Sequence, residues 1–296
     1  MKEFEFIESL KRISLSSPYG IGDDASVADD LLIAKDLMVE NVHFAPSESV
    51  NVVVDRLFAS NISDIAAMGG ISAEYQALFG TAIPKTIDKK DLLDAIYLAA
   101  EKYNVTLIGG DTSFSKQGLF LSLTIIGKRN RYILTRAGAK PGDKVYLSRP
   151  TGYAKYELRR RLGFLNGNQI VESNREPEHK LGDILGRSGG VTACIDISDG
   201  LGRDLSHIAE ASGARIILRK ENLPLPKLLL PKARLYEYAL SSGEEYALAF
   251  TVKPGTEIIY GKPFYEIGLV SEGAGCFMTD DDGSLTDVSH MGYEHD

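Results

Sequence analysis

The chain has 296 residues and is acidic, with 33 lysines and arginines against 41 aspartates and glutamates and a formal net charge of −8. This balance argues against non-specific binding to nucleic acid or to an anionic membrane surface, because both need a basic footprint. No apolar run approaches the roughly 18 residues of a membrane span, and the N-terminal sequence MKEFEFIESLKRISL is unlike a signal peptide.

Apolar runs rich in β-branched residues alternate along the chain with segments of helical periodicity, which predicts an α/β (α+β) architecture. In the N-terminal half we expect, in chain order, helix 3–12, strand 30–36, helix 50–68, strand 73–79, helix 89–103, strand 106–108 and strand 119–128. In the C-terminal half we expect strand 144–148, helix 154–162, a helix near 179–187, strand 192–197, helix 201–211, strand 215–219 and strand 246–251. The glycines at 69–70 and 213 follow helical segments, where left-handed C-terminal caps are expected.

The length predicts about two domains, at roughly 150 residues each. The best boundary candidate is GAKPGD, residues 138–143, because its Pro-Gly pair is a strong turn signal between two strand-like runs. It divides the chain into residues 1–138 and 139–296. The polar stretch 164–177 is expected to be a surface loop, with a short lid as the alternative. Two cysteines without a C-x-x-C pair are typical of a cytoplasmic protein and argue against a disulfide framework.

Several aspartates stand beside apolar segments rather than on obviously solvated faces. They are Asp24 in GIGDDASV, Asp36 after LLIAK, Asp64 within a helix, Asp111 after LIGG, and Asp196 and Asp199 in ACIDISDG. Burying a carboxylate costs several kcal/mol unless it is paired or bound to a metal. Few cations lie near them in sequence, so hard divalent cations are the simplest remedy, and Mg²⁺ also takes substrate phosphate oxygens.

Helical spacing sharpens the interpretation of Asp64. On a 3.6-residue period Asn61 lies inside the apolar stripe that contains Leu57, and Asp64 lies at its edge. A helix edge facing water would explain Asp64 alone. Asn61 and Asp64 together favour a buried polar site. For Asp111 the alternative is a plain Gly-Gly-Asp turn at the end of a strand.

The segment Asp196-Ile-Ser-Asp-Gly is more informative. Strand alternation places Asp196 and Ser198 on one face, and Ser198 or Asp199 is then expected to cap the helix that begins near Leu201. A helix N-terminus beside a metal held by carboxylates is a natural phosphate site. A simple capping role would explain Asp199 but not Asp196.

Nucleotide motifs of the common kinds are absent from the sequence. The run Gly20-x-Gly22-x-x-Ala25 imitates a dinucleotide fingerprint, but no clear strand precedes it and no helix follows it. Two aspartates there would also face the pyrophosphate. There is no Walker A sequence and neither HRD nor DFG, so any use of ATP is not of the P-loop or protein-kinase kind.

The acid-bearing segments resemble, in order and over nearly the whole chain, the thiamine-monophosphate kinase family of the aminoimidazole ribonucleotide synthetase superfamily. The matching segments are GIGDDASV, KDLMVENVHF, ASNISDIAAMGG, LIGGDTSF, LTRAGAKPGD, CIDISDGLGRDLSHIAEASGA, LSSGEEYALAFT and GYEH. The resemblance implies mixed sheets covered by helices. It implies a metal- and ATP-binding N-terminal domain that forms a homodimer, and a C-terminal domain that closes the active site.

The resemblance also implies the activity, which is transfer of the ATP γ-phosphoryl group to thiamine monophosphate with several Mg²⁺ ions. It implies metal ligands at Asp24, Asp36, Asp64, Asp111, Asp196 and Asp199. It implies nucleotide contacts at Tyr103, Gly110, Asp111, Arg136 and Ser198, and contacts to the thiamine side at His43, Glu244 and Tyr293. The residues expected to carry the chemistry are Asp111, Asp196, Asp199 and Arg136.

This reaction agrees with the residues that the sequence offers. The nucleophile is a phosphate oxygen that is already anionic at neutral pH, because the second pKa of a phosphate monoester is ~6. No general base is required, and the obstacle is repulsion between two polyanions. Metals on clustered carboxylates reduce that repulsion and align the transfer, and Arg136 could stabilise charge on the phosphates.

The sequence departs from the family pattern at three places, which leaves alternatives open. Lys35 replaces a small hydroxyl residue, Ser-Gly-Glu-Glu at 242–245 replaces Gly-Gly-Glu-Asp, and the turn at 148–152 is poorer in glycine. One alternative is another ATP-dependent enzyme of the superfamily, although the cysteines expected of selenophosphate synthetase and of the hydrogenase maturation dehydratase are missing. Others are a non-catalytic nucleotide- or thiamine-phosphate-binding protein, favoured by Lys35, and a structural protein with solvated aspartates.

Overall fold

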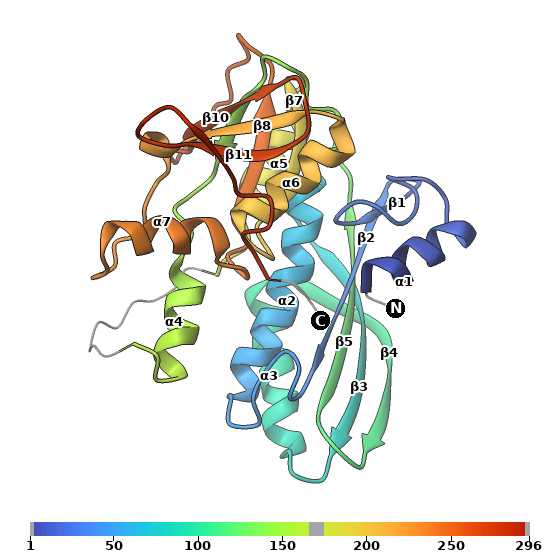
Figure 1. Cartoon of the computed structure of the whole chain (residues 1–296). Helices are drawn as coiled ribbons and strands as arrows, with labels where there is room; N and C mark the ends of the chain where they lie inside the picture. Colours follow the sequence, from blue (N-terminus) through green and yellow to red (C-terminus); the bar gives the residue numbers. More distant parts are fainter. Residues whose placement is uncertain (1–2, 166–174, 294–296) are drawn as a thin grey trace.

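The structure is a computed structural model that describes residues 3–165 and 175–293, and it is built on two sheets (Figure 1). Most of the polar stretch 164–177, expected to be a loop or lid, lies outside these ranges. Among the described residues, no helix is both long and apolar enough to cross a membrane.

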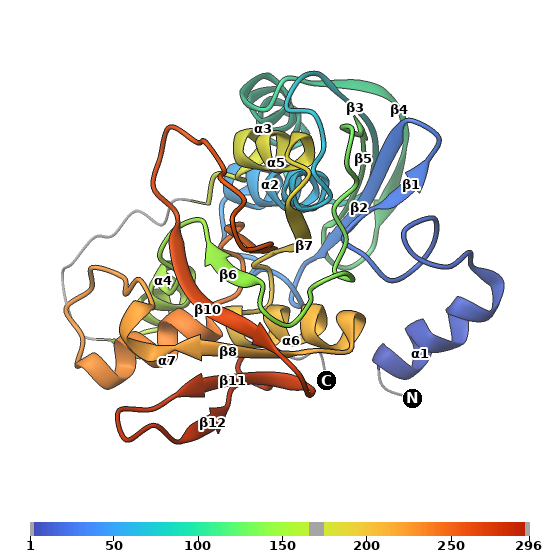
Figure 2. The ribbon, with the colours of Figure 1, turned by 90° about the horizontal axis from the view of Figure 1, so that it is seen from above.

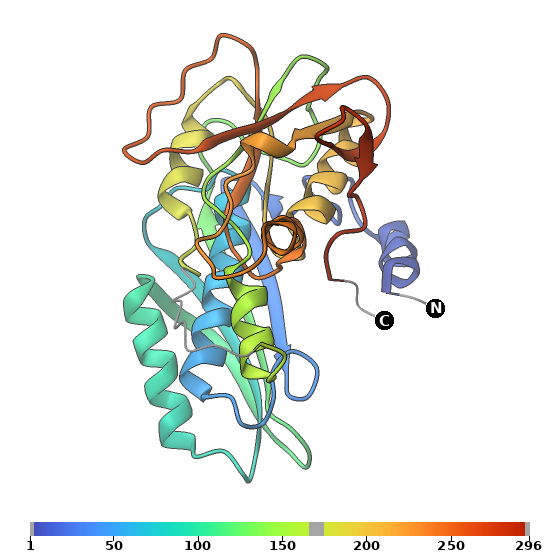
Figure 3. The same cartoon turned by 60° about the vertical axis from the view of Figure 1, so that its left-hand side comes forward.

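The N-terminal sheet has five strands in the order β1-β2-β5-β3-β4. Its strands are β1 (Ser26–Ala28), β2 (Leu31–Val39), β3 (Tyr75–Pro84), β4 (Val105–Ser115) and β5 (Phe120–Lys128). β3 and β4 pair in parallel and the other neighbours pair antiparallel, so the sheet is mixed. Helices α2 (Val50–Ala67) and α3 (Lys89–Lys102) lie side by side on one side of it (Figure 3), and the chain begins with α1 (Glu3–Leu10) and a 3₁₀ turn, Lys11–Ile13.

Alternation along β5 explains how this half forms its core. Leu121, Leu123 and Ile125 are fully buried and belong to the same apolar cluster as Leu57 and Phe58 of α2, while the intervening residues of β5 are only partly buried. Apolar residues recur every second position on the strand and about every 3.6 positions on the helix, so each element has one apolar face, and the two faces pack together. β4, at the edge of the sheet, is exposed along almost its whole length.

The C-terminal sheet has seven strands in the order β12-β11-β8-β10-β6-β9-β7. Its strands are β6 (Lys144–Leu147), β7 (Val191–Asp196), β8 (Arg215–Arg219), β9 (Leu248–Val252), β10 (Tyr265–Ser271), β11 (Gly275–Thr279) and β12 (Leu285–Asp287). The helices are α4 (Tyr153–Arg161), α5 (His179–Arg187), α6 (Leu201–Ser212) and α7 (Lys232–Ser241), with a 3₁₀ turn at Lys220–Asn222. Only β8 and β11 pair in parallel among the described strands of this sheet.

Helix α5 joins the two halves by lying directly against α2 (Figure 2). A Cβ at Gly182 would come within 2.3 Å of the Ala66 carbonyl oxygen, and one at Gly186 within 2.2 Å of the Gly69 carbonyl oxygen. The backbone of α5 is therefore in direct contact with the backbone at the C-terminal end of α2, an approach that only glycine permits. β7 also packs on α2, so the carboxyl end of β7 comes close to the C-terminal turns of that helix.

The expected α/β architecture with mixed sheets is confirmed, and the expected helices and strands are present with ends shifted by a few residues. The glycine caps are also confirmed, since Gly69 and Gly213 have φ of 73° and 60°. β4 is much longer than the expected 106–108, because the chain continues in extended form through its Gly-Gly pair. The sequence pattern did not predict β1, α7 and β10 to β12. The strands are short and depend on pairing with their neighbours, and α7 packs against α6 and α4.

Candidate active site

Three of the expected aspartates meet at the junction of the two sheets. Asp24 comes from the loop before β1, Asp64 from the last turns of α2 and Asp196 from the end of β7, and one carboxylate oxygen of each lies within 4.8 Å of the others. Burial raises the pKa of Asp64 and Asp196 well above the ordinary value, and the neighbouring carboxylates raise it further. Such a group is costly when fully ionised, and a divalent cation would relieve that cost.

Arg136 is the cation that the structure places at this cluster. Its backbone N–H donates to Asp23 Oδ1 at 2.6 Å, and its side chain donates to Asp24 Oδ1 from Nε at 3.1 Å and from Nη2 at 2.5 Å. Burial opposes the charge on Arg136, but the Asp24 carboxylate outweighs it and raises the pKa of the guanidinium. Burial likewise raises the pKa of Asp24, and Arg136 opposes that shift.

Asp36 extends the cluster on the side of β2. Burial raises its pKa, while a hydrogen bond from Ser60 and the charges of His43 and Lys35 lower it. The charge of Asp36 also raises the pKa of Asp64. Lys35 itself points its ammonium group to Ser122 Oγ, at 2.6 Å.

The donor set fits a hard metal ion. Asp24 Oδ2 is buried and has no hydrogen-bond partner among the described residues, and the same is true of Asn61 Oδ1. Asn61 is fully buried on α2, three residues before Asp64, so the expectation of a buried polar site on this helix is confirmed. Carboxylate and amide oxygens left unpaired beside other carboxylates are the ligands that Mg²⁺ prefers.

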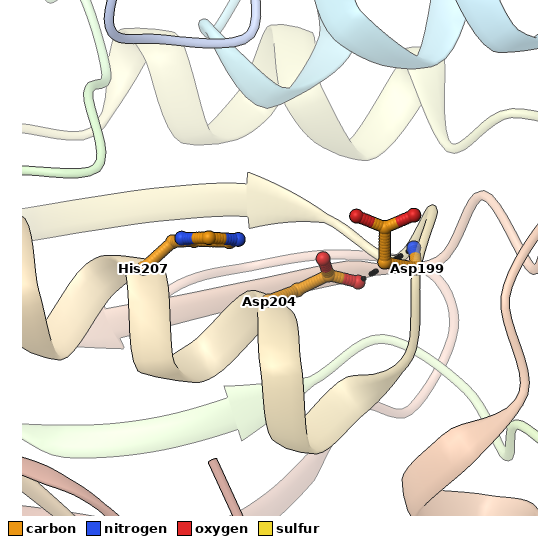
Figure 4. A group of neighbouring side chains, drawn as sticks. All are labelled: Asp199, Asp204 and His207. Carbon is orange, nitrogen blue, oxygen red and sulfur yellow. Dashed lines mark hydrogen bonds between the residues drawn. The ribbon is translucent and has the colours of Figure 1, made fainter. Parts of the chain in front are cut away.

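Asp199 lies in the loop between β7 and α6, with Asp204 and His207 on the first turns of that helix (Figure 4). One ligand atom of each lies within 4.8 Å of the others. Burial raises the pKa of Asp204 to about 8, although hydrogen bonds from Gly200 and Asp199 oppose the shift. Burial lowers the pKa of His207 to about 4, and nearby arginines lower it further.

The expected cap of α6 is wrong. Gly200 is the N-cap residue, and among the described residues no side chain caps the helix through a hydrogen bond. Instead, the Asp204 carboxylate folds back and accepts hydrogen bonds from the N–H groups of Ser198 and Asp199 at 3.0 and 3.2 Å. These N–H groups point to an internal anion rather than to an open phosphate site.

The residues expected on the thiamine side gather around the same loop. Glu244 donates its backbone N–H to the Ser198 carbonyl at 2.8 Å, and Tyr293 donates its own to the Asp199 carbonyl at 2.9 Å. Arg56 of α2 forms an ion pair with Glu244 and donates to the His43 carbonyl at 3.1 Å. The structure thus brings together all three thiamine-side candidates, beside the loop that carries Asp199.

The remaining candidates lie elsewhere in the chain. Asp111 is exposed on the edge strand β4, where its Oδ1 accepts a hydrogen bond from the Thr112 N–H at 2.9 Å. Gly110 precedes it with φ of 154°, and a Cβ there would lie 1.9 Å from the Phe79 carbonyl oxygen, so only glycine fits. Tyr103 is buried at the end of α3, where the charges of Asp55 and Lys102 act on its hydroxyl.

Sequence reasoning missed three residues of this region. Arg56 is 5% exposed. It forms ion pairs with Glu48 and Glu244 and donates a hydrogen bond to the His43 carbonyl. Ser63 donates its hydroxyl to Asp196 Oδ2 at 2.6 Å. Asp204 organises the loop before α6. Arg56 and Ser63 lie in an apolar helix, and this is the same signal that drew attention to Asn61.

Comparison with known proteins identifies the family. Residues 22–128 match the family described as AIR synthase related protein, N-terminal domain. The chain is 29% identical to the thiamine-monophosphate kinase of Pyrococcus horikoshii, over 100% of this chain and 96% of that protein. It is 30% identical to the thiamine-monophosphate kinase of Aquifex aeolicus, over 99% of this chain and 97% of that protein. The chain belongs to the thiamine-monophosphate kinase family.

Solved structures of family members agree with the fold. The thiamine-monophosphate kinase of Aquifex aeolicus matches with a TM-score of 0.81 at 28% identity, over 96% of this chain and 97% of that chain. A structure described as AaThiL complexed with AMPPCP and TMP matches with a TM-score of 0.79 at 28% identity, over 99% of this chain and 97% of that chain. The expected fold of the aminoimidazole ribonucleotide synthetase superfamily is thereby confirmed.

Proposed function

We propose that this chain is an ATP-dependent thiamine-monophosphate kinase, which transfers the γ-phosphoryl group of ATP to the phosphate of thiamine monophosphate and yields thiamine diphosphate and ADP. The observation that carries the proposal is the meeting of Asp24, Asp64 and Asp196 beside the Ser198–Gly200 loop, to which the Glu244 and Tyr293 segments are hydrogen-bonded. Relatives that align over nearly their whole length are named for this activity, and one is described as complexed with AMPPCP and TMP.

Several Mg²⁺ ions would be held by Asp24, Asp36, Asp64, Asp196 and Asp199. When bound, they would neutralise the phosphates of both substrates and align the transfer. Arg136 keeps Asp24 turned toward the cluster and adds positive potential there. Ser63 keeps Asp196 in place through its hydroxyl.

No residue needs to remove a proton from the nucleophile, because the attacking phosphate oxygen is already anionic. The chain's residues therefore act by positioning and by charge. Arg136 would stabilise charge on the transferring group, as its pKa keeps it protonated throughout the physiological range. Ser198 and Asp199 would lie at the phosphates, between the acid cluster and the thiamine side.

On the thiamine side, the Glu244 carboxylate would face the cationic ring system of the substrate, and Arg56 would orient that carboxylate. The φ of Glu244 is 55°, a left-handed backbone conformation that residues other than glycine adopt rarely. His43 is fixed by the bond from the Val39 N–H to its Nδ1, at 3.0 Å. Tyr293 is more than half exposed, and its phenol ring would present a face for stacking on an aromatic ring.

Asp111, Gly110 and Tyr103 would serve the nucleotide side in a homodimer. β4 presents an unpaired edge with exposed Leu107 and Phe114, a surface that proteins normally cover. A second copy of the chain laid against this edge would bury it and place the metal and nucleotide contacts of Asp111 at the interface. We place the domain boundary at residues 138–139, with residues 139–296 closing the site.

Product analysis tests the proposed function. The purified protein is incubated with Mg²⁺, ATP and thiamine monophosphate, with thiamine and the ribonucleotide precursor of aminoimidazole as control substrates. We expect thiamine diphosphate and ADP in equal amounts and no product from either control. Absence of product from every substrate, together with Mg²⁺-dependent binding of ATP, would refute the kinase and favour the non-catalytic binding protein.

A further inference from the structure

A buried carboxylate fills a cradle of backbone N–H groups at the start of α6. Asp204 is 1% exposed, and its Oδ2 accepts hydrogen bonds from Ser198, Asp199 and Gly200 at 3.0, 3.2 and 3.0 Å. Successive N–H groups that converge in this way form an anion-binding concavity. Here the anion is supplied by the chain itself, four residues into the helix (Figure 4).

The opposite side of the same three-residue loop carries the thiamine-side residues. The Ser198 carbonyl accepts the Glu244 N–H at 2.8 Å, and the Asp199 carbonyl accepts the Tyr293 N–H at 2.9 Å. The N–H groups of the loop thus bind Asp204, while its C=O groups bind two separate segments of chain. Rotation of the peptide planes of this loop would move Glu244, Tyr293 and the Asp199 side chain together.

Gly200 makes this arrangement possible. Its φ is 144°, and a Cβ there would lie 3.0 Å from the Gly292 Cα and 3.2 Å from the Leu240 carbonyl oxygen. The loop therefore turns sharply and is enclosed by the C-terminal segment. A loop enclosed in this way has few alternative conformations, provided that its N–H groups are satisfied.

We infer that Asp204 is a positioning residue of the kinase, which fixes the Ser198–Gly200 loop so that the Asp199 carboxylate and the Glu244 and Tyr293 segments keep one relative arrangement. This inference rests on the proposed function, because it takes Asp199 to bind a metal and the other two to bind the thiamine side. In this role Asp204 would act through the loop and would not contact either substrate. Its Oδ2 is the shared acceptor of three converging N–H groups, whereas an amide of equal size offers only one acceptor oxygen beside an NH₂ group that donates rather than accepts.

The test is the Asp204→Asn variant of the full-length protein, with Mn²⁺ as the probe for the metal site. We expect the Kd for Mn²⁺ and the KM for thiamine monophosphate each to rise about tenfold or more, because partners that orient metal ligands have effects of this size. Electron paramagnetic resonance detects the binding of Mn²⁺ directly and so measures its Kd without turnover. A merely structural role would lower the melting temperature without moving either constant.

Glu245→Gln is the matched control. Glu245 is also a buried carboxylate, and its Oε1 accepts hydrogen bonds from the N–H groups of Gly152 and Ala154 at the start of α4, at 2.8 and 3.0 Å. Its loss should lower the melting temperature as Asp204→Asn does, with the Mn²⁺ Kd within about twofold of the wild-type value. Equal Mn²⁺ affinity in wild type and Asp204→Asn would overturn the inference and leave the proposed function standing.

A measurement on the wild-type protein covers the case in which Asp204→Asn does not fold. Hydrogen exchange at the amides of Ser198, Asp199 and Gly200 should be slow, because all three donate to a buried acceptor. Exchange as fast as at an exposed loop would overturn the inference. A wild-type protein that binds no Mn²⁺ would refute the metal role of Asp199 and the proposed function with it.

Discussion

The Arg136 guanidinium holds the Asp24 carboxylate through two hydrogen bonds to a single oxygen, Oδ1. This contact ties the segment after β5 to the loop before β1, across 112 positions of sequence. Because both bonds go to Oδ1, the second oxygen of Asp24 is buried and has no hydrogen-bond partner among the described residues, in a side chain that clusters with Asp64 and Asp196. The pair thus fixes one carboxylate of the cluster while leaving it able to bind a metal.

Asp196→Asn should abolish turnover while leaving the fold intact. The amide keeps a partner for Ser63 but removes one charge from the metal site. Burial and neighbouring carboxylates raise the pKa of Asp196, so the metal-free variant should melt at the same temperature as the wild type or higher. Steady-state kinetics and calorimetry in EDTA check both parts. A kcat close to wild type would contradict the metal-cluster mechanism.

Arg136→Met should destabilise the metal-free protein by about 2 kcal/mol, because Asp24 is left buried without its cation and can escape only by taking up a proton. Urea unfolding in EDTA measures the change. The same substitution in an Asp24→Asn background should cost much less. Equal costs in the two backgrounds would show that the ion pair does not contribute.

The metal-free protein should lose stability as the pH rises from 6.5 to 8. Burial raises the pKa of Asp64, Asp196 and Asp204, that of Asp204 to about 8, so the folded state keeps protons that the unfolded chain has already lost. Stability therefore falls with rising pH until each folded-state pKa is passed. His207 acts in the opposite direction, but only between its folded pKa of about 4 and the ordinary 6.5.

Urea unfolding across this pH window, in EDTA and in saturating Mg²⁺, checks the prediction. Bound Mg²⁺ should flatten or reverse the slope, because it stabilises the ionised carboxylates that the metal-free protein disfavours. A free energy of unfolding that rises with pH in EDTA would contradict the assignment of raised pKa values to this cluster.

Phe114→Glu should separate the proposed homodimer into monomers. Phe114 is 70% exposed on β4, where a charge would have to be buried against a second copy. Sedimentation equilibrium measures the dissociation constant. Leu229→Glu is the matched control, because Leu229 is 83% exposed and lies in the loop before α7, away from the N-terminal sheet. An unchanged constant for Phe114→Glu would place the interface elsewhere.

The elements that sequence analysis predicted well are those with strong internal periodicity. The 18-residue helix α2 and the alternating strand β5 carry their own apolar pattern, and both were expected within a residue or two of where they lie. β10 to β12 carry little such pattern. Gly268 of β10, for example, would place a Cβ 2.3 Å from the Ile217 carbonyl oxygen, a constraint that exists only once β8 is its neighbour.

The candidate site shows the same division. Acids beside apolar segments were visible in the sequence, and Asn61 was correctly expected to be buried with Asp64. Which acids meet depends on the packing of β7 against α2, which no local pattern encodes. The cap of α6 was wrongly predicted for a related reason. Ser198 and Asp199 have the composition of caps, but the turn of the chain places Gly200 at the N-cap position, and the Asp204 side chain binds the N–H groups of the loop from within the helix.

Because α5 packs against α2, the two halves of the sequence share one of their hydrophobic clusters, and neither half has a complete core of its own. Ala66 and Ala67 of α2 are enclosed by Leu181 and Leu185 of α5, in a cluster that also contains strands β7 and β9. A chain truncated after residue 138 would expose these alanines to water and leave α2 with one flank bare. Neither half can therefore be transferred alone to another protein. A chimaera that uses either half would have to include both α2 and α5.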